Sequence, residues 1–91
     1  MTIVATLKDG RVISKASITA VVLSAAGNAA LKATVSDLRK VEYVLQWNVT
    51  TNPAQNIYGP RDTKITNNVV GTTVYAAGAT TVAGEVIAIG Y

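Results

Sequence analysis

The alternation of side chains between Val41 and Val49 constrains the fold of this chain most. Every odd-numbered residue in this stretch is large and apolar, and the even-numbered residues are polar except for Val44. Because successive side chains on a strand point to opposite faces, this period of two predicts a strand with one buried face. The residues expected to pack on the core through that face are Val41, Tyr43, Leu45, Trp47 and Val49.

Short apolar runs separated by turn signals cover most of the remaining chain. Asp9-Gly10 is a strong hairpin signal, since a type I′ turn needs positive φ at both central residues, and Asn67-Asn68 and Ala77-Gly78-Ala79 mark further turns. Six to eight closely spaced strands predict an all-β chain, either a small antiparallel β-sandwich or a partly open barrel. The expected strands are Thr2–Leu7, Arg11–Lys15, Ile18–Ser24, Leu31–Val35, Val41–Val49, Thr63–Thr66, Val69–Ala76 and Thr81–Ile89.

Two segments have helical alternatives. Ser36-Asp37-Leu38-Arg39 offers an N-cap, which predicts one short helical turn near residues 36–40. The Ala-rich stretch 16–46 has a second possible fold, a helix hairpin around Gly27-Asn28. Its many Thr and Val residues are poor helix formers, and 41–49 has the wrong period for a helix. Strands are therefore favoured there, while Ile18–Ser24 is expected to be buried on both faces.

Length and composition indicate a single domain, 1–91, with a thin core. The chain has no Cys, no Phe and one Met, so the core must come from Val, Ile, Leu, Ala and a few Tyr. A domain of this size buries only about 60–65% of its unfolded surface, so burial against neighbouring subunits is a natural supplement. Charged residues make up 14% of the chain, against about a quarter in an average soluble domain. This sparse charge suits a protein that packs among other proteins.

The residue inventory argues against catalysis. The chain has no His and no Cys, which removes the commonest general base and the usual zinc ligands. Of its five carboxylates, Asp9 and Asp37 have local roles in turns, and Glu42 and Glu85 would have to converge in one pocket to form a catalytic pair. We expect a protein that is not an enzyme, with no catalytic residue, no cofactor and no metal.

The segment from Asn52 to Asp62 is the first candidate contact region. It carries two Pro residues, Tyr58 and Arg61; aromatic and Arg side chains are enriched at interface hot spots. In the alternative, Ile57 and Tyr58 fold back over the open end of the sandwich. The second candidate is Tyr91, which either lies in its own sheet or at a subunit boundary. The expected interface residues are Tyr58, Arg61 and Tyr91.

The order of elements in the last two-thirds of the chain is similar to a family of virion proteins. A Leu-Arg-Lys-Val turn leads into the strand that ends at Val49, and hairpin Val69–Ala76 precedes a last strand, Val82–Gly90, containing Glu-Val-Ile-Ala-Ile-Gly. Over residues 36–91 this order resembles the small β-sandwich virion proteins of tailed bacteriophages, of the capsid decoration or cement type. The resemblance implies assembly in many copies through subunit contacts, with no catalytic residue.

The sequence pattern predicts a non-enzymatic structural protein, and the resemblance implies that it belongs to a viral particle and is located in the virion after synthesis in the host cytoplasm. The expected partners are other virion proteins, such as a major capsid protein or a tail component, and further copies of the chain. No signal peptide or membrane span is visible, and the eight Lys and Arg residues are scattered, so neither a membrane nor nucleic acid is expected as partner. The alternative is a binding or adhesion module that recognises a carbohydrate or a protein through loops around Tyr58 and Tyr75.

Overall fold

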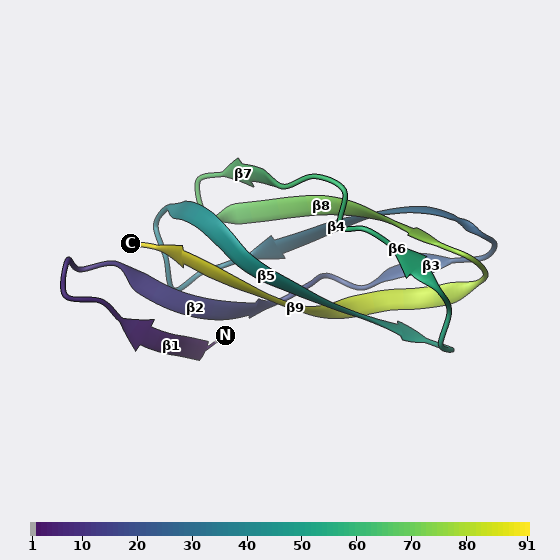
Figure 1. Cartoon of the computed structure of the whole chain (residues 1–91), viewed down its shortest axis with the longest axis horizontal. Coiled ribbons are helices and arrows are strands. Elements are labelled where there is room, and N and C mark those ends of the chain that lie inside the picture. Colours follow the sequence, from purple (N-terminus) through teal and green to yellow (C-terminus); the bar gives the residue numbers. More distant parts are fainter. Residues whose placement is uncertain (1) are drawn as a thin grey trace.

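The computed structural model describes residues 2–91 and the side chains of residues 3–91. The described residues form nine strands in two antiparallel sheets that pack together without closing into a barrel, and none of them is helical (Figure 1). The expected all-β fold is confirmed, as a sandwich. The strands are β1 (Thr2–Thr6), β2 (Val12–Ser17), β3 (Val21–Leu23), β4 (Gly27–Thr34), β5 (Val41–Asn52), β6 (Ile57–Tyr58), β7 (Lys64–Thr66), β8 (Val69–Ala76) and β9 (Thr80–Gly90).

Each sheet is built around one long strand from the C-terminal third of the chain. In sheet A, β9 pairs with β5 along one edge and with β2 and β3, end to end, along the other, while β1 lies outside β2. In sheet B, β8 pairs with β4 on one edge and with β6 and β7, end to end, on the other. The molecule is elongated, with principal extents of 45 × 19 × 16 Å between Cα atoms.

The core between the sheets is made of small and medium aliphatic side chains, as the composition predicts. On β4 the burial alternates strictly, with Ala29, Leu31 and Ala33 buried and the residues between them exposed. No Tyr belongs to the buried cluster. The buried apolar residues of this cluster are Ala16, Ile18, Ala29, Leu31, Ala33, Val35, Leu38, Val41, Val70, Val74, Val82, Val86 and Ala88.

The expectation for the Val41–Val49 strand is confirmed for the strand and for the core packing of Val41, Trp47 and Val49, and it is wrong for Tyr43 and Leu45. Val41 is buried, but Tyr43 is 62% and Leu45 53% exposed, and Val44 packs against the core instead. The register against β9 shifts between Val41 and Tyr43 and again between Val44 and Gln46. Each shift is a β-bulge, which inserts one residue and changes the phase of the alternation. Two bulges therefore turn two large apolar side chains out of the sandwich.

Two other local expectations are corrected. Only Val21–Leu23 of the expected strand Ile18–Ser24 is a strand, and Val22 is 76% exposed. Before β3 the backbone N–H groups of Ile18 and Thr19 donate to carbonyls on different sheets, those of Gly84 and Lys32. The chain therefore contacts both sheets at this point, between β2 and β3 of sheet A.

Residues 36–40 form a turn and not a helical turn. The Leu38 N–H donates to the Val35 carbonyl at 2.9 Å, and the Leu38 side chain is buried. The Asp37 carboxylate accepts a hydrogen bond of 2.9 Å from the buried Ser14 hydroxyl on β2. Because Asp37 bonds to a distant strand, the local helix signal is overridden by tertiary contacts.

The hairpin between β1 and β2 forms where Asp9-Gly10 predicts it, with a different turn. Only Gly10 has positive φ, at 88°, and the Leu7 N–H donates to the Arg11 carbonyl, as in a three-residue loop with Gly at the left-handed position. Asp9 accepts hydrogen bonds from the Arg11 backbone N–H at 3.1 Å and from its Nε at 2.7 Å. Asp9 and Arg11 therefore close the hairpin together.

A pH titration tests this closure. The pKa of the Asp9 carboxyl lies below its ordinary value of 3.8, mainly because the Arg11 backbone N–H donates to the carboxylate and additionally because of the Arg11 side chain. Because the pKa of Asp9 is lower in the folded state, its ionised carboxylate stabilises the hairpin at pH values above the ordinary pKa. This stabilisation is lost as the pH falls through the folded-state pKa. The Arg11 amide resonance in NMR should titrate with a midpoint below 3.8. A midpoint at or above that value, or an unchanged titration in Asp9→Asn, would contradict the assignment.

Candidate interaction surfaces

The outer face of sheet A is apolar at one end, where a solvent-facing sheet is usually polar. The run Val86-Ile87-Ala88-Ile89 on β9 is apolar at every position. Val86 and Ala88 are buried in the core, so Ile87 and Ile89 point to the opposite face. A continuous apolar run is typical of a strand that is covered on both faces.

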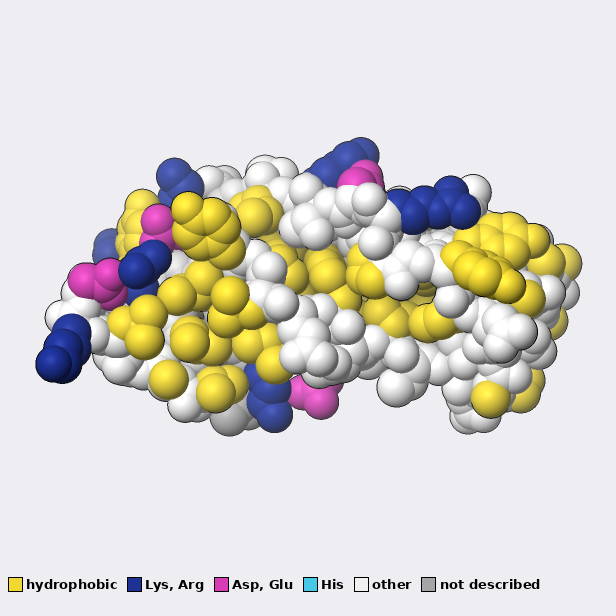
Figure 2. Space-filling view, viewed as in Figure 1, with side chains coloured by type: hydrophobic (Ala, Val, Ile, Leu, Met, Phe, Trp, Pro, Cys, Tyr) yellow, Lys and Arg dark blue, Asp and Glu magenta, His cyan; other side chains and the backbone are white. Residues whose placement is uncertain are grey.

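Neighbouring strands extend this apolar surface. The register places Ile13 and Tyr43 on either side of Ile89, and Ala5 opposite Ile13. Leu45 occupies the bulge beside the pair formed by Gln46 and Ile87. Figure 2 shows hydrophobic side chains gathered over the end of the molecule where Figure 1 draws β1, β2, the start of β5 and the end of β9. We refer to these residues as the outer apolar face: Ala5, Ile13, Tyr43, Leu45, Ile87 and Ile89.

Charged residues border the outer apolar face towards the middle of the molecule. Lys15 lies opposite Ile87 on β2, and Glu85 lies two residues before Ile87 on β9. An alternating strand places Glu85 and Ile87 on the same face. An apolar centre with a charged border is the usual composition of a protein–protein interface.

The expected contact residue Tyr58 lies on the other sheet. Tyr58 on β6 pairs with Tyr75 on β8, and their ring centroids are 6.0 Å apart at an interplanar angle of 42°. Tyr58 is 58% exposed, and Ile57 before it is half-buried. Of the two alternatives for this segment, Ile57 thus folds back onto the sandwich, whereas the Tyr58 ring remains open to solvent.

Arg61 lies close to Tyr58 in the chain, on the extended path between β6 and β7. Its backbone N–H donates to the Thr73 carbonyl at 3.1 Å, and its side chain is exposed. No ion pair joins Arg61 to Asp62 among residues 2–91. At the start of this segment the Thr80 hydroxyl donates to the Pro53 carbonyl at 2.6 Å. The segment 53–62 is therefore hydrogen-bonded to the sandwich at both ends and is not a detached loop.

Tyr91 lies at the opposite end of the molecule from Tyr58, as the C-terminal label and β6 show in Figure 1. Its carbonyl accepts hydrogen bonds from the backbone N–H groups of Arg39 and Lys40, and its side chain is 46% exposed. Since Gly90 pairs with Val41 on β5, Tyr91 borders the outer apolar face. The structure thus places Tyr91 with the sheet A surface and keeps it apart from Tyr58 and Arg61.

The carboxylates do not gather into a reactive site. Glu85 pairs with Asn48 on β5, whereas Glu42 lies in the bulge of β5 that faces Ile89 and Gly90. Glu42 is therefore about 13 Å or more from Glu85 along β9, at roughly 3.3 Å per residue. In the part of the chain that the structure describes, no three His, Cys, Asp or Glu side chains lie close enough together to hold a metal ion. Nor does any helix within residues 2–91 have the length and apolar character needed to cross a membrane.

The sequence reasoning missed Tyr43, Leu45, Ile13 and Ile87 as surface residues. A signal was present in Val86–Ile89, because apolar residues at successive strand positions require cover on both faces. Val44, the exception in the β5 pattern, was a second signal, since it marks the change of phase. Comparison of the chain with family models, with curated proteins and with solved structures finds no match.

Proposed function

We propose that this protein is a non-enzymatic structural component of a viral particle, of the capsid decoration or cement type, and that it acts by binding neighbouring subunits through the outer apolar face. The single observation that carries the proposal is the exposure of Tyr43 and Leu45, at 62% and 53%, beside the Val86–Ile89 segment of β9, which is apolar on both sides. A face of this kind is stabilised when a second protein covers it.

The size of the molecule is compatible with an interface of ordinary area. Its two longer extents are 45 and 19 Å between Cα atoms, and a stable interface covers about 800 Å² on each partner. The outer apolar face lies at one end of the molecule, so an interface of this area would also include surface beyond it. Apolar burial contributes about 25 cal/mol per Å², and repetition over many copies adds avidity even where one contact is weak.

Quantitative mass spectrometry of purified particles tests the proposed location. Particles from the cells that express this chain are separated on a density gradient and washed at high salt. We expect the protein to sediment with the particles, in a fixed ratio to the main shell protein and in many copies. Its absence from the particle fraction, while it accumulates in the cell lysate, would contradict the proposal.

The tyrosine pair, in which Tyr58 is exposed and Tyr75 half-buried, supports a second candidate, a small binding module. Tyr58 and Tyr75 present adjacent rings on the outer face of sheet B, and such aromatic surfaces are common in binding sites. A protein that stays monomeric at high concentration and binds a small ligand saturably would favour this function over the first.

A further inference from the structure

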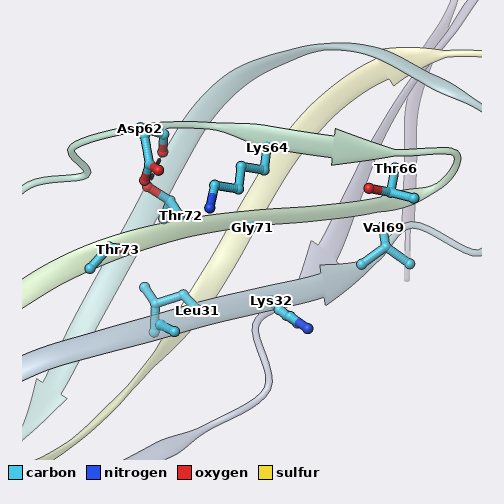
Figure 3. A pocket seen from close by; sticks show the side chains of 10 residues that line it. Leu31, Lys32, Asp62, Lys64, Thr66, Val69, Gly71, Thr72 and Thr73 are labelled. Carbon is cyan, nitrogen blue, oxygen red and sulfur yellow. Dashed lines mark hydrogen bonds between the residues drawn. The ribbon is translucent and has the colours of Figure 1, made fainter.

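A groove of about 500 Å³ lies on the outer face of sheet B, away from the outer apolar face (Figure 3). Its floor is Gly71 on β8, which has no side chain. The register places Lys32 on β4 and Lys64 on β7 directly opposite Gly71, one on each side. Since neighbouring strands lie about 4.8 Å apart, the backbones of the two lysines lie about 10 Å from each other across Gly71.

The two lysines give the groove a net positive charge, because Asp62 is the one carboxylate among the residues that line it. Both are exposed, and neither has an ion-pair partner among the residues that the structure describes. In Figure 3 the two ammonium groups point in different directions, so both flexible side chains would turn towards Gly71 to bind one anionic group there. Lysine suits this role because its long stem and compact charge adapt to a carboxylate or a sulfate. The groove therefore selects a ligand with at least one negative charge.

Polar groups around the lysines suit a ligand that also carries hydroxyl groups. Thr66 and Thr73 line the groove with hydroxyls, which both donate and accept hydrogen bonds. Asp62 adds a carboxylate, an acceptor for ligand hydroxyls. Its backbone carbonyl accepts a hydrogen bond from the Thr72 hydroxyl, which holds the Asp62 segment against β8 (Figure 3). A carboxylate in the groove repels a densely charged polyphosphate chain and tolerates a ligand with isolated charges.

The tyrosine pair extends this surface along the same strand. Gly71, Thr73 and Tyr75 occupy alternate positions of β8, so their outward sides share one face. Tyr75 lies about 13 Å from Gly71 at roughly 3.3 Å per residue. An aromatic pair at that distance, with its rings inclined at 42°, offers apolar ring surface to a ring of the same ligand.

From this arrangement we propose that the outer face of sheet B binds an acidic oligosaccharide, with a carboxylate or sulfate between Lys32 and Lys64 and a further sugar ring on Tyr58 and Tyr75. The charge fits the lysines, the sugar hydroxyls fit Asp62, Thr66 and Thr73, and the apolar side of a sugar ring fits the tyrosines. The site is independent of the outer apolar face, so the two proposals fail or succeed separately.

Isothermal titration calorimetry of the full chain at low salt tests the site with defined probes. The probes are trigalacturonic acid, a sulfated chondroitin tetrasaccharide, uncharged galactotriose and a ten-nucleotide oligothymidylate. We expect saturable binding of at least one acidic saccharide, at least tenfold tighter than that of galactotriose and of the oligonucleotide. The preference between the first two probes distinguishes a carboxylate from a sulfate ligand.

Matched variants localise the binding. The double variant K32Q/K64Q should bind the acidic saccharide at least tenfold more weakly. The double variant K8Q/K15Q removes the same charge from the sheet A side and should change this affinity less than twofold. Tyr58→Ala should weaken the binding of the trisaccharide about fivefold and leave the binding of monomeric galacturonic acid unchanged. Circular dichroism and light scattering of each variant show whether its fold and its association with other subunits are retained.

Three results would overturn the assignment. The first is that neither acidic saccharide binds saturably. The second is that galactotriose binds as tightly as the acidic saccharides, or that the oligonucleotide binds more tightly than they do. The third is that K8Q/K15Q and K32Q/K64Q lose the same amount of affinity for the acidic saccharide. The last result would mean that net charge alone, and not the groove, attracts the ligand.

Discussion

Replacing both Tyr43 and Leu45 by serine is expected to abolish the association of this protein with its neighbours and to leave its fold intact. Both side chains are more than half exposed in the single chain, so their removal should change the free energy of unfolding by only about 1 kcal/mol. Central apolar residues of an interface typically contribute about 2 kcal/mol each when truncated. Together the two changes should weaken association roughly a thousandfold, at about 1.4 kcal/mol per factor of ten.

Val22→Ser is the matched control for this double variant. Val22 is also an exposed aliphatic residue of sheet A, at 76%, but it pairs with Thr81 at the other end of β9. Sedimentation of the protein alone and with particles measures the association, and thermal unfolding measures the stability. If the double variant associates as well as Val22→Ser does, the outer apolar face is not the contact surface.

Replacing Gly84 by alanine is expected to remove a large part of the protein's stability. Gly84 lies in the centre of β9 with φ at +131°, and a Cβ atom there would overlap the Asn48 carbonyl oxygen on β5. Strain in such a backbone conformation costs about 1–3 kcal/mol, and the overlap forces the two longest strands apart. We expect a loss of about 4 kcal/mol from a total of about 5–14 kcal/mol, at roughly 0.05–0.15 kcal/mol per residue.

Substitutions at two other glycines distinguish the backbone strain from the steric overlap as the cause of this loss of stability. Gly10 has a positive φ of +88°, and no atom lies within 4 Å of the position that a Cβ would take there, whereas Gly27 has open space without positive φ. Gly10→Ala should therefore cost about 1–2 kcal/mol from the backbone conformation alone, and Gly27→Ala should cost nothing measurable. Urea unfolding of the three variants gives the comparison. A Gly84→Ala variant as stable as Gly10→Ala would show that β5 and β9 can separate at this point without penalty.

Local patterns predicted the sheets well and the faces of one strand poorly. On β4 the alternation of Ala29, Leu31 and Ala33 with exposed residues follows directly from the sequence, because the strand is regular over its whole length. On β5 the same argument fails at Tyr43 and Leu45, because the bulges are set by the pairing with β9. A period of two identifies a strand, but only the register of its partner shows where the phase changes.

The candidate surfaces were predictable to different extents. Tyr58 and Tyr91 were identified from residue type and position, and both are substantially exposed. Their separation to opposite ends of the molecule depends on the topology, which the sequence alone does not reveal. The meeting of Lys32 and Lys64 across Gly71 likewise requires the registers of two strand pairs. Residues far apart in the chain form a site only when the pairing of the sheet is known.

The two proposals concern different faces of the sandwich. The outer side of sheet A is apolar where β9 ends, which suits burial by another protein, while the outer side of sheet B combines lysines, hydroxyls and tyrosines, which suits a polar ligand. Since β9 and β8 lie at the centres of the two sheets, both surfaces are built on long, paired strands. Neither surface depends on a detached loop.

Hydroxyl-radical footprinting of Tyr43, in the isolated protein and in the purified particle, tests the central claim most directly. Tyr43 is open to solvent in the single chain, so its oxidation rate reports whether another protein covers the outer apolar face. We expect its rate to fall about tenfold in the particle, while the rate of Tyr58 on sheet B changes less than twofold. A Tyr43 that reacts equally fast in both states would contradict the account.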